Sequence, residues 1–322
     1  MEPITIGKSD ITTPPIGIGT MSWSNNKMFG YGDKLSHEAG KEVYNAAMDR
    51  GLTFFDTAEM YGLGHSERVL GRLVNQRPHG AYVATKYAPA PWRFTRRAFR
   101  RALDNSLKRL DVKTIDLYQV HFPGGFIKIP DLMDELADAA DAGKIRYIGV
   151  SNYSVAQMRE AMNALAKRGH PLVSNQVEYS LIHRSPEFDG VLDLCQQENI
   201  TLIAYSPVGR GILNGKYTID SLPNDMRSNY SQFKGDKLVK VMAVVDQLRV
   251  LADKYEKTPA QIAINWLARQ PNVLPIPGAK HIGHVKSNVE AINFTLHDED
   301  AALLDEVSQP FARATSFSFR PE

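Results

Sequence analysis

The sequence has a single cysteine and no long apolar stretch. Cys195 cannot form an internal disulfide, and its neighbours, Val-Leu-Asp-Leu-Cys-Gln, are typical of a buried position in a helix. Nowhere do about eighteen apolar residues follow one another, as a membrane-spanning helix would require. The first residues also lack the basic and apolar parts of a signal peptide. We therefore expect a soluble, cytoplasmic protein with no membrane contact.

Neither sign of charge is in clear excess. The 38 Lys and Arg residues against 36 Asp and Glu leave a net charge of +2, which provides no overall field to attract nucleic acid or an anionic membrane. The strongly basic run 96–109 carries Ala98, Phe99, Leu103 and Leu107 between its charged residues. That spacing is typical of an outer helix with a solvated face. We expect a small-molecule partner rather than nucleic acid, and a monomer or weak homo-oligomer.

Several motifs of catalysis and ligand binding are missing. The chain has no Gly-x-Ser-x-Gly of hydrolases and no His-Glu-x-x-His among its nine histidines, and His281 with His284 makes an incomplete metal site. No metal is expected. Gly17 and Gly19 lack the third glycine of a dinucleotide-binding loop, so we interpret them as a turn at the end of a strand.

Short β-branched or aromatic runs alternate with longer segments of helical spacing. The predicted strands are 16–19, 53–56, 82–85, 115–121, 147–150, 173–177, 201–205 and 273–276, and the predicted helices are 36–50, 66–75, 95–110, 130–142, 154–167, 186–198, 258–269 and 284–292. Ser154 and Gln157 have the spacing of a capping box. Strict alternation predicts an α/β fold, a single (β/α)₈ TIM barrel over residues 1–322. Long loops at 29–32 and 209–233 are expected over its mouth, where ligands bind.

Four side chains able to do chemistry follow the predicted strands. Asp56 ends the second strand, with Tyr61 in the loop behind it. Lys86 follows the third strand, and His121 ends the fourth. Each alone has an ordinary structural explanation, such as a helix cap for Asp56 or a surface position for Lys86. Together, at the carboxyl ends of successive barrel strands, they indicate an active site.

Carbonyl reduction is the chemistry that uses this set. Addition of hydride to a carbonyl carbon builds an alkoxide that must be protonated, and a phenol with a pKa of about 10 is a weak acid unless a cation stabilises its anion. Tyr61 is the candidate proton donor, Lys86 the cation, and Asp56 the carboxylate that keeps the lysine charged. His121 either aims the carbonyl oxygen through a hydrogen bond or takes part in proton transfer.

The residues around these positions resemble the aldo-keto reductases over nearly the whole chain. Phe-Phe-Asp56-Thr-Ala-Glu-Met-Tyr61-Gly is similar to the family's Asp-Thr-Ala-x-x-Tyr-Gly signature, and residues 106–121 are similar to its long central motif. Further matches are Gly149-Val-Ser151-Asn152, Asn175-Gln176-Val-Glu, Ala204-Tyr205-Ser206-Pro207 and Ile276-Pro277-Gly278-Ala279-Lys280. The resemblance implies a TIM barrel that reduces a small-molecule carbonyl compound with NADPH, yielding NADP⁺. Its catalytic tetrad would be Asp56, Tyr61, Lys86 and His121.

The resemblance also implies the contacts with the cofactor. Ser151, Asn152 and Gln176 would hold the nicotinamide carboxamide, and Tyr205 would stack on the ring. Lys280 would face the adenosine 2′-phosphate and so favour NADPH over NADH. The remaining implied contacts are Gly19, Thr20, Met21 and Asp56 after the first two strands, Ser206, Pro207, Gly209, Arg210 and Gly211 over the pyrophosphate, and Gly278, Ala279, His284 and Asn288 on the adenosine side.

The chain departs from the family pattern on both sides of the site. Lys280 is followed by His281-Ile-Gly-His284, where the family often has Thr-Pro-Glu-Gln. His121 is followed by Phe122-Pro-Gly-Gly instead of charged residues. Residues 23–33 are similar to a branch that includes pyridoxal reductases. The substrate is expected to contact Trp23, Tyr61, His121 and Phe122.

Two other functions are open at this point. The β subunits of potassium channels are similar to this family, bind NADPH and regulate a partner, so a redox-sensing subunit is one alternative. An isomerase or lyase on the same barrel is the other, and it predicts activity without nicotinamide.

Overall fold

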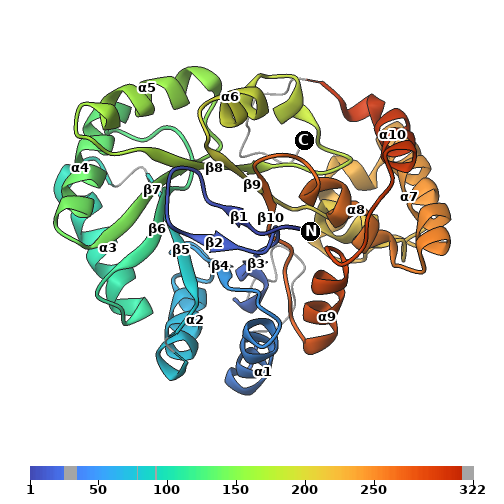
Figure 1. Ribbon diagram of the computed structural model, residues 1–322, viewed down its shortest axis with the longest axis horizontal. Helices are drawn as coiled ribbons and strands as arrows, with labels where there is room; N and C mark the ends of the chain where they lie inside the picture. Colours follow the sequence, from blue (N-terminus) through green and yellow to red (C-terminus); the bar gives the residue numbers. More distant parts are fainter. Residues whose placement is uncertain (25–34, 78, 91–92, 314–322) are drawn as a thin grey trace.

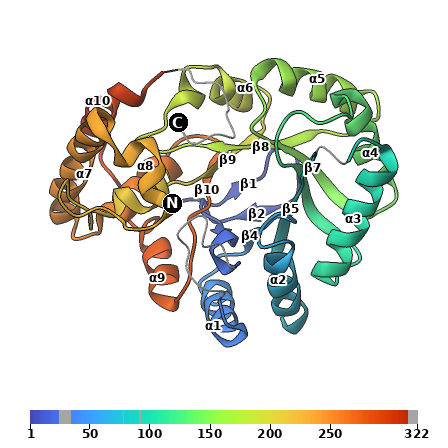
Figure 2. The same cartoon turned by 180° about the vertical axis from the view of Figure 1, so that it is seen from behind.

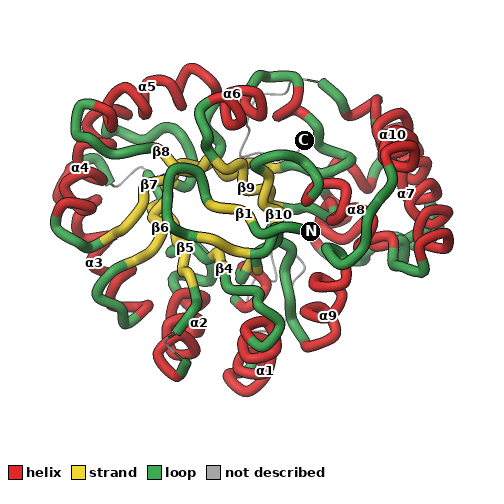
Figure 3. The backbone as a smooth tube through the Cα atoms, in the orientation of Figure 1, coloured by secondary structure: helices red, strands yellow, loops and turns green. Residues whose placement is uncertain are grey.

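Eight parallel strands form the centre of the molecule. The computed structural model describes residues 1–24, 35–77, 79–90 and 93–313. Each strand pairs with its neighbours in chain order, and every pair is parallel (Figures 1 and 3). The strands are β3 (Ile18–Gly19), β4 (Phe54–Asp56), β5 (Tyr82–Tyr87), β6 (Ile115–Val120), β7 (Ile145–Ser151), β8 (Leu172–Glu178), β9 (Thr201–Tyr205) and β10 (Val273–Pro275).

The two edges of this sheet meet and close the barrel. The N–H of Gly17 donates to the carbonyl of Pro275 at 2.9 Å, and that of Gly19 to Pro277 at 3.0 Å. Gly19 also forms a parallel bridge with Gly278. A Cβ at position 19 would lie 2.8 Å from the carbonyl oxygen of Ile276, so the close approach requires glycine there. The predicted (β/α)₈ barrel is confirmed.

The predicted helices are present in the predicted order and surround the sheet (Figure 3). The expected capping box is confirmed, because the Ser154 hydroxyl accepts from the N–H of Gln157 and the Gln157 side chain accepts from the N–H of Ser154. Cys195 is buried in a helix, as expected. The helices are α1 (His37–Met48), α2 (His65–Gln76), α3 (Arg96–Leu110), α4 (Ile129–Asp141), α5 (Val155–Ala166), α6 (Val191–Gln197), α8 (Pro259–Ala268) and α9 (Ile282–Glu290).

Two helices and one β-hairpin were not predicted from the sequence. Helix α7 (Gly235–Tyr255) follows the long loop after β9, and α10 (Asp298–Val307) packs beside it on the outside of the barrel (Figures 1 and 2). An antiparallel hairpin of β1 (Ile4–Thr5) and β2 (Thr12–Thr13) precedes the barrel. None of the helices in the described part of the chain is long and apolar enough to cross a membrane.

The hairpin closes the amino end of the barrel. Ile6 and Ile11 are fully buried in one apolar cluster with strand residues such as Phe54 and Leu117. The N–H of Gly7 donates to the hydroxyl of Thr201, the first residue of β9, at 2.8 Å. In Figure 1 the hairpin lies across the middle of the strand ring. The carboxyl ends of the strands are therefore the end at which a site can open.

Gly71 and Gly40 provide a matched test of helix packing. A Cβ at Gly71 in α2 would lie 2.6 Å from the carbonyl carbon and Cα of Leu110 in α3, whereas the nearest atom to one at Gly40 in α1 is 3.5 Å away. We expect Gly71→Ala to lower the free energy of unfolding by about 1–3 kcal/mol through overpacking. Gly40→Ala should leave it unchanged or raise it by up to about 1 kcal/mol, because alanine favours helix. Urea denaturation measures both, and equal effects would contradict the packing explanation.

Candidate active site

The structure brings the four tetrad residues together at the carboxyl ends of the strands. Asp56 is the last residue of β4, Lys86 lies near the end of β5, and His121 directly follows β6. Tyr61 lies in the loop between β4 and α2. Strand register supports this arrangement, since Asp56 pairs with Ala84, two residues before Lys86.

Lys86 connects the members of the tetrad. Its ammonium donates to a carboxylate oxygen of Asp56, to the carbonyl of Thr57 at 2.8 Å and to the hydroxyl of Tyr61 at 3.3 Å. The Tyr61 and His121 rings meet edge to face with centroids 5.9 Å apart. The side chains of Lys86 and Asp56 are 0% and 1% exposed. A phenol, an ammonium, a carboxylate and an imidazole thus share one buried corner of the mouth.

Burial and neighbouring charges set the protonation of this corner. Burial lowers the pKa of Lys86, and the adjacent Asp56 carboxylate opposes that effect. Burial, with a further contribution from the Lys86 charge, lowers the pKa of His121 to about 3. At neutral pH the imidazole is therefore uncharged. A neutral imidazole can donate one hydrogen bond, but it is not an acid that gives up a proton at that pH.

Two glutamine amides complete the environment of Asp56. Its second carboxylate oxygen accepts from Gln176 at 2.8 Å and from Gln119 at 3.2 Å. Gln119 was not predicted as a site residue, although it stands two positions before His121 and strand alternation puts both on one side of β6. Gln176 was predicted as a nicotinamide contact, and here its N–H group bonds to Asp56.

A second hydrogen-bonded group lies beside the tetrad on the ends of β7, β8 and β9. The Ser151 hydroxyl donates to the carbonyl of Gln176 at 2.7 Å, and the Asn152 amide donates to Ser151 and to the carbonyl of His121, each at 3.0 Å. The Tyr205 hydroxyl donates to the Asn152 side-chain oxygen at 3.0 Å. Asn152 takes the left-handed backbone conformation, with φ of 60°. These four predicted residues form one connected polar wall.

The loop after β9 contains a run of left-handed backbone. Ser206, Gly209, Arg210 and Gly211 have φ values of 53°, 54°, 56° and 94°, with Pro207 inside the run. Ser206 and Arg210 are not glycines, so this conformation strains their backbone, and such strain is concentrated at ligand sites. The Arg210 guanidinium stacks over the Tyr230 ring at 4.2 Å and lies 3.4 Å from the Glu178 carboxylate. Those contacts hold it beside the strand ends.

The predicted adenosine-side residues cluster between β10 and α9. The Lys280 N–H donates to Nδ1 of His284 at 3.2 Å, and the His281 and His284 rings lie 3.8 Å apart. Burial lowers the pKa of Lys280, and the nearby Arg227 charge lowers it further. The Lys216 charge likewise contributes to a lowered pKa of His284, after burial, His281 and Lys280. Several positive groups therefore converge here.

Lys216 and Arg227 were missed from the sequence. They stand in the long loop 209–233, which carries no periodic pattern, so no signal indicated that they face α9. Of the predicted contacts after the first strand, Gly19 reaches this region through its bridge to Gly278. The Thr20 hydroxyl donates to the carbonyl of Asp56 at 2.9 Å.

Among the buried polar side-chain atoms that have no hydrogen-bond partner in the described part of the chain, three lie at the mouth of the barrel. They are Oγ of Ser22, Nδ1 of His121 and Nδ2 of Asn288. Ser22 lies beside Gly278, since a Cβ at Gly278 would be 3.3 Å from the Ser22 hydroxyl. Buried polar groups are nearly always paired, and unpaired ones point to a missing ligand or water. Their spread from α9 to His121 fits an elongated polar ligand across the mouth, such as a dinucleotide.

The predicted substrate contacts divide into two groups. The Phe122 ring lies 5.8 Å from the His121 ring. The His121 ring in turn contacts the Tyr61 ring. Trp23 is instead fully buried, and its indole N–H donates to the carbonyl of Ala279 at 2.7 Å. Trp23 thus supports the loop that carries Ala279. The predicted mouth loop 29–32 lies outside the described residues.

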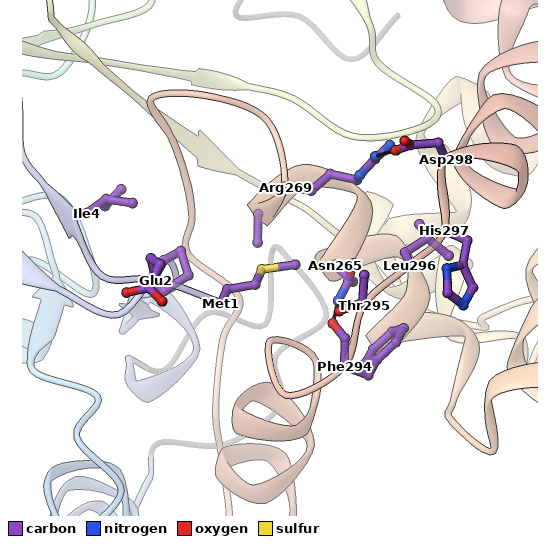
Figure 4. Close-up of a pocket in the computed structure, with 12 residues that line it drawn as sticks. Met1, Glu2, Ile4, Asn265, Arg269, Phe294, Thr295, Leu296, His297 and Asp298 are labelled. Atoms are coloured by element: carbon purple, nitrogen blue, oxygen red, sulfur yellow. Dashed lines mark hydrogen bonds and ion pairs between the residues drawn. The ribbon is translucent and has the colours of Figure 1, made fainter.

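A separate hollow of about 480 Å³ lies at the opposite end of the barrel. Met1, Ile4 and Pro15, near the hairpin, line it together with Arg269 and Asp298, which form an ion pair across its rim (Figure 4). Arg269 precedes the amino end of β10, so this hollow is remote from the tetrad. No group of three or more potential metal ligands occurs among the described residues.

The buried pair of Asp56 and Lys86 can be tested by double mutation. Asp56→Asn keeps an acceptor for the glutamine amides but leaves Lys86 buried without a carboxylate, which should lower the free energy of unfolding by about 3–5 kcal/mol. Asp56→Asn with Lys86→Met leaves neither charge buried and should recover more than half of that loss. Urea denaturation of the two variants measures the difference. A double variant no more stable than Asp56→Asn alone would show that the two charges do not stabilise each other.

Comparison with known proteins agrees with this geometry. The sequence profile of the Aldo/keto reductase family matches residues 15–309. The NADP(+) aldo-keto reductase yakc of Schizosaccharomyces pombe is 35% identical over 89% of this chain and 86% of its own, and the chloroplastic pyridoxal reductase of Arabidopsis thaliana is 32% identical over 92% and 83%. The crystal structure of a Klebsiella pneumoniae aldo-keto reductase in complex with NADPH superposes with a TM-score of 0.78, at 29% identity, over 99% of this chain and 100% of that one. A profile match over most of the chain, two curated relatives and a shared barrel place this chain in the aldo/keto reductase family.

Proposed function

We propose that the protein reduces an aldehyde or ketone to an alcohol with NADPH, and that Tyr61 is the general acid. The observation that carries this proposal is the position of the Lys86 ammonium between the Asp56 carboxylate and the Tyr61 hydroxyl, 3.3 Å from the latter. The Klebsiella pneumoniae relative was crystallised with NADPH, which supports the choice of cofactor. The presence of all four residues, Asp56, Tyr61, Lys86 and His121, favours a catalytic role over that of a redox-sensing subunit.

The chain's own residues account for the proton. NADPH supplies hydride to the carbonyl carbon, and the Tyr61 hydroxyl gives its proton to the carbonyl oxygen as negative charge develops there. The Lys86 ammonium stabilises the resulting phenolate, and Asp56 holds Lys86 in place. His121 is uncharged, so it aims the carbonyl oxygen by a hydrogen bond. Of the two roles left open by the sequence, the uncharged state of His121 supports the first, aiming of the carbonyl oxygen.

The cofactor-binding residues follow from the polar groups at the mouth. The Ser151 hydroxyl and the Asn152 amide can hydrogen-bond to the carboxamide of the nicotinamide, and the Tyr205 ring offers a flat apolar face on which the nicotinamide ring can stack. The unpaired amide nitrogen of Asn288 suits an acceptor on the adenine side. Lys280 lies where positive groups converge, which suits the 2′-phosphate.

Replacing the proposed acid tests the reaction. Tyr61→Phe should retain NADPH binding but lower kcat by about 10²–10⁴-fold, because only the proton donor is removed. Tyr87→Phe is the control, since its hydroxyl is buried without a partner among the described residues and lies in the same strand as Lys86. Nicotinamide absorbance with pyridoxal, simple aldehydes and sugar-derived aldehydes measures turnover. Full activity of Tyr61→Phe would refute the acid assignment, and repeated turnover by the wild type separates an enzyme from a sensor.

Replacing Lys280 tests the choice of cofactor. Lys280→Met should raise KM for NADPH by about 10–100-fold, the loss expected for one charge-assisted contact, and leave KM for NADH unchanged. Lys286→Met, an exposed lysine on α9, is the matched control and should change neither value. An equal rise for both cofactors would contradict a contact with the 2′-phosphate.

A further inference from the structure

A group of buried charges lies behind the tetrad, and the proposed reaction does not use it. It comprises two glutamates that flank Tyr61 in the sequence, Glu59 and Glu67, and two arginines, Arg93 and Arg109. The glutamate side chains are 6% and 0% exposed, and the arginine side chains 22% and 18%. We call these four residues the clamp.

Glu59 ties the start of the Tyr61 loop to the strand that carries Lys86. Its carboxylate accepts from the N–H of Ala88, directly after β5, at 2.7 Å. The same oxygen accepts from Arg93, and the second oxygen accepts from Arg93 at 2.9 Å. Lys86 lies two residues before Ala88. The position of Glu59 is therefore fixed relative to the lysine.

Glu67 ties the other end of the loop to the same strand. It lies in the first turn of α2 and accepts from the hydroxyl of Thr85 at 2.8 Å. Thr85 directly precedes Lys86. Nε of Arg109 donates to the second oxygen of Glu67 at 2.5 Å. The segment that carries Tyr61 is thus held to β5 on both sides.

Arg109 reaches across the whole segment from the outer helix α3. Besides bonding to Glu67, it lies 3.8 Å from the Glu59 carboxylate. Its side chain also packs against the backbone of Gly64, where a Cβ would lie 2.6 Å from Nε of Arg109. Gly64 has φ of 79°, so the loop turns there in a conformation that glycine allows. Arg109 therefore contacts the loop before, within and after the turn that follows Tyr61.

We propose that Arg109 is a positioning residue, which through Glu59 and Glu67 holds the Tyr61 hydroxyl at bonding distance from the Lys86 ammonium. This inference rests on the proposed function, because it assumes that Tyr61 delivers a proton. Arg109 touches none of the reacting groups itself. Proton delivery requires an accurate position, and a shift of about 1 Å in a catalytic group can lower turnover about 100-fold.

The same helix provides a control pair. Arg100 of α3 donates two hydrogen bonds, at 2.6 and 2.9 Å, to Glu135 of α4, whose side chain is also 0% exposed. This pair resembles Arg109 and Glu67 in chemistry and in burial of the carboxylate. These two bonds join α3 to α4, and neither involves the loop that carries Tyr61. A role in stability alone would make the two pairs equivalent in their effect on catalysis.

Glu67 also acts on Lys86 through its charge. Burial lowers the pKa of Lys86, Asp56 opposes this most strongly, and Glu67 opposes it further. Glu67→Gln keeps the shape of the side chain but removes a negative charge close to the ammonium. Removing that charge makes Lys86 lose its proton more readily, so the alkaline limb of the reduction rate should move to lower pH.

The experiment compares Arg109→Lys and Glu67→Gln with Arg100→Lys and Glu135→Gln in the full chain. Each variant is assayed for kcat, KM of the carbonyl substrate, Kd of NADPH, the pH profile and melting temperature. For the clamp variants we expect kcat to fall by about 10–100-fold while Kd of NADPH stays within about twofold. The alkaline limb of Glu67→Gln should shift to lower pH. The control pair should keep kcat unchanged, and its melting temperature should fall less, because the Arg100 side chain is 61% exposed against 18% for Arg109.

Unchanged kcat and an unchanged pH profile in both clamp variants would overturn the proposal, provided that Tyr61→Phe is inactive. An equal fall of kcat in the control pair would overturn it as well, since stability would then explain the effect. Wild-type turnover by Tyr61→Phe would instead be a failure of the proposed reaction. If Arg109→Lys does not fold, Glu67→Gln decides, because its amide oxygen can still accept from Arg109 while its amide nitrogen donates to the hydroxyl of Thr85.

Discussion

The buried ion pair between Lys86 and Asp56 is the constraint on which the site depends. Moving two charges out of water costs several kcal/mol per ion, and their attraction repays this only with good geometry and further hydrogen bonds. The barrel supplies both. Thr57 and Tyr61 accept from the ammonium, while Gln119 and Gln176 donate to the carboxylate. The buried ion pair beside the phenol is therefore held by contacts from β4, β6 and β8 or the loops that follow them.

The two ends of the barrel differ in composition: the amino end is packed with apolar side chains, and the carboxyl end carries the polar side chains of the site. At the amino end, the hairpin residues Ile6 and Ile11 fill the interior with apolar side chains. At the carboxyl end, the strand tips carry polar groups that bond to one another, as Tyr205 does to Asn152. Stability and chemistry thus draw on different parts of the same strands.

Much of the fold and of the tetrad could be predicted from the sequence. Alternating strands and helices fix where strands end, so Asp56, Lys86 and His121 could be assigned to one mouth without coordinates. Gln119, near the carboxyl end of the predicted strand 115–121, could have been assigned to the mouth in the same way, but it was overlooked. Helix α7 was also overlooked, although Leu238, Val241, Val245 and Leu248 are buried at helical spacing.

Other features had no local signal. Lys216 and Arg227 come close to Lys280 and His284 only through the path of a long irregular loop, which propensity and periodicity do not determine. Trp23 was expected near the substrate. Its ring is fully buried, and the bond from its indole N–H to Ala279, which depends on residues far apart in the sequence, had no local signal. The clamp likewise joins three elements whose contacts emerge only on folding.

The closure between β3 and β10 has a further consequence. Among the described residues, two backbone hydrogen bonds, from Gly17 and Gly19, join the first and last strands of the barrel. The unpaired groups of Ser22 and Asn288 stand on either side of that seam. A ligand that bonds to both Ser22 and Asn288 would hold the barrel closed at the junction of β3 and β10, where the strands are joined by the fewest bonds. Binding of such a ligand therefore stabilises the closed barrel, because the ligand can bond to both residues only while β3 and β10 are paired.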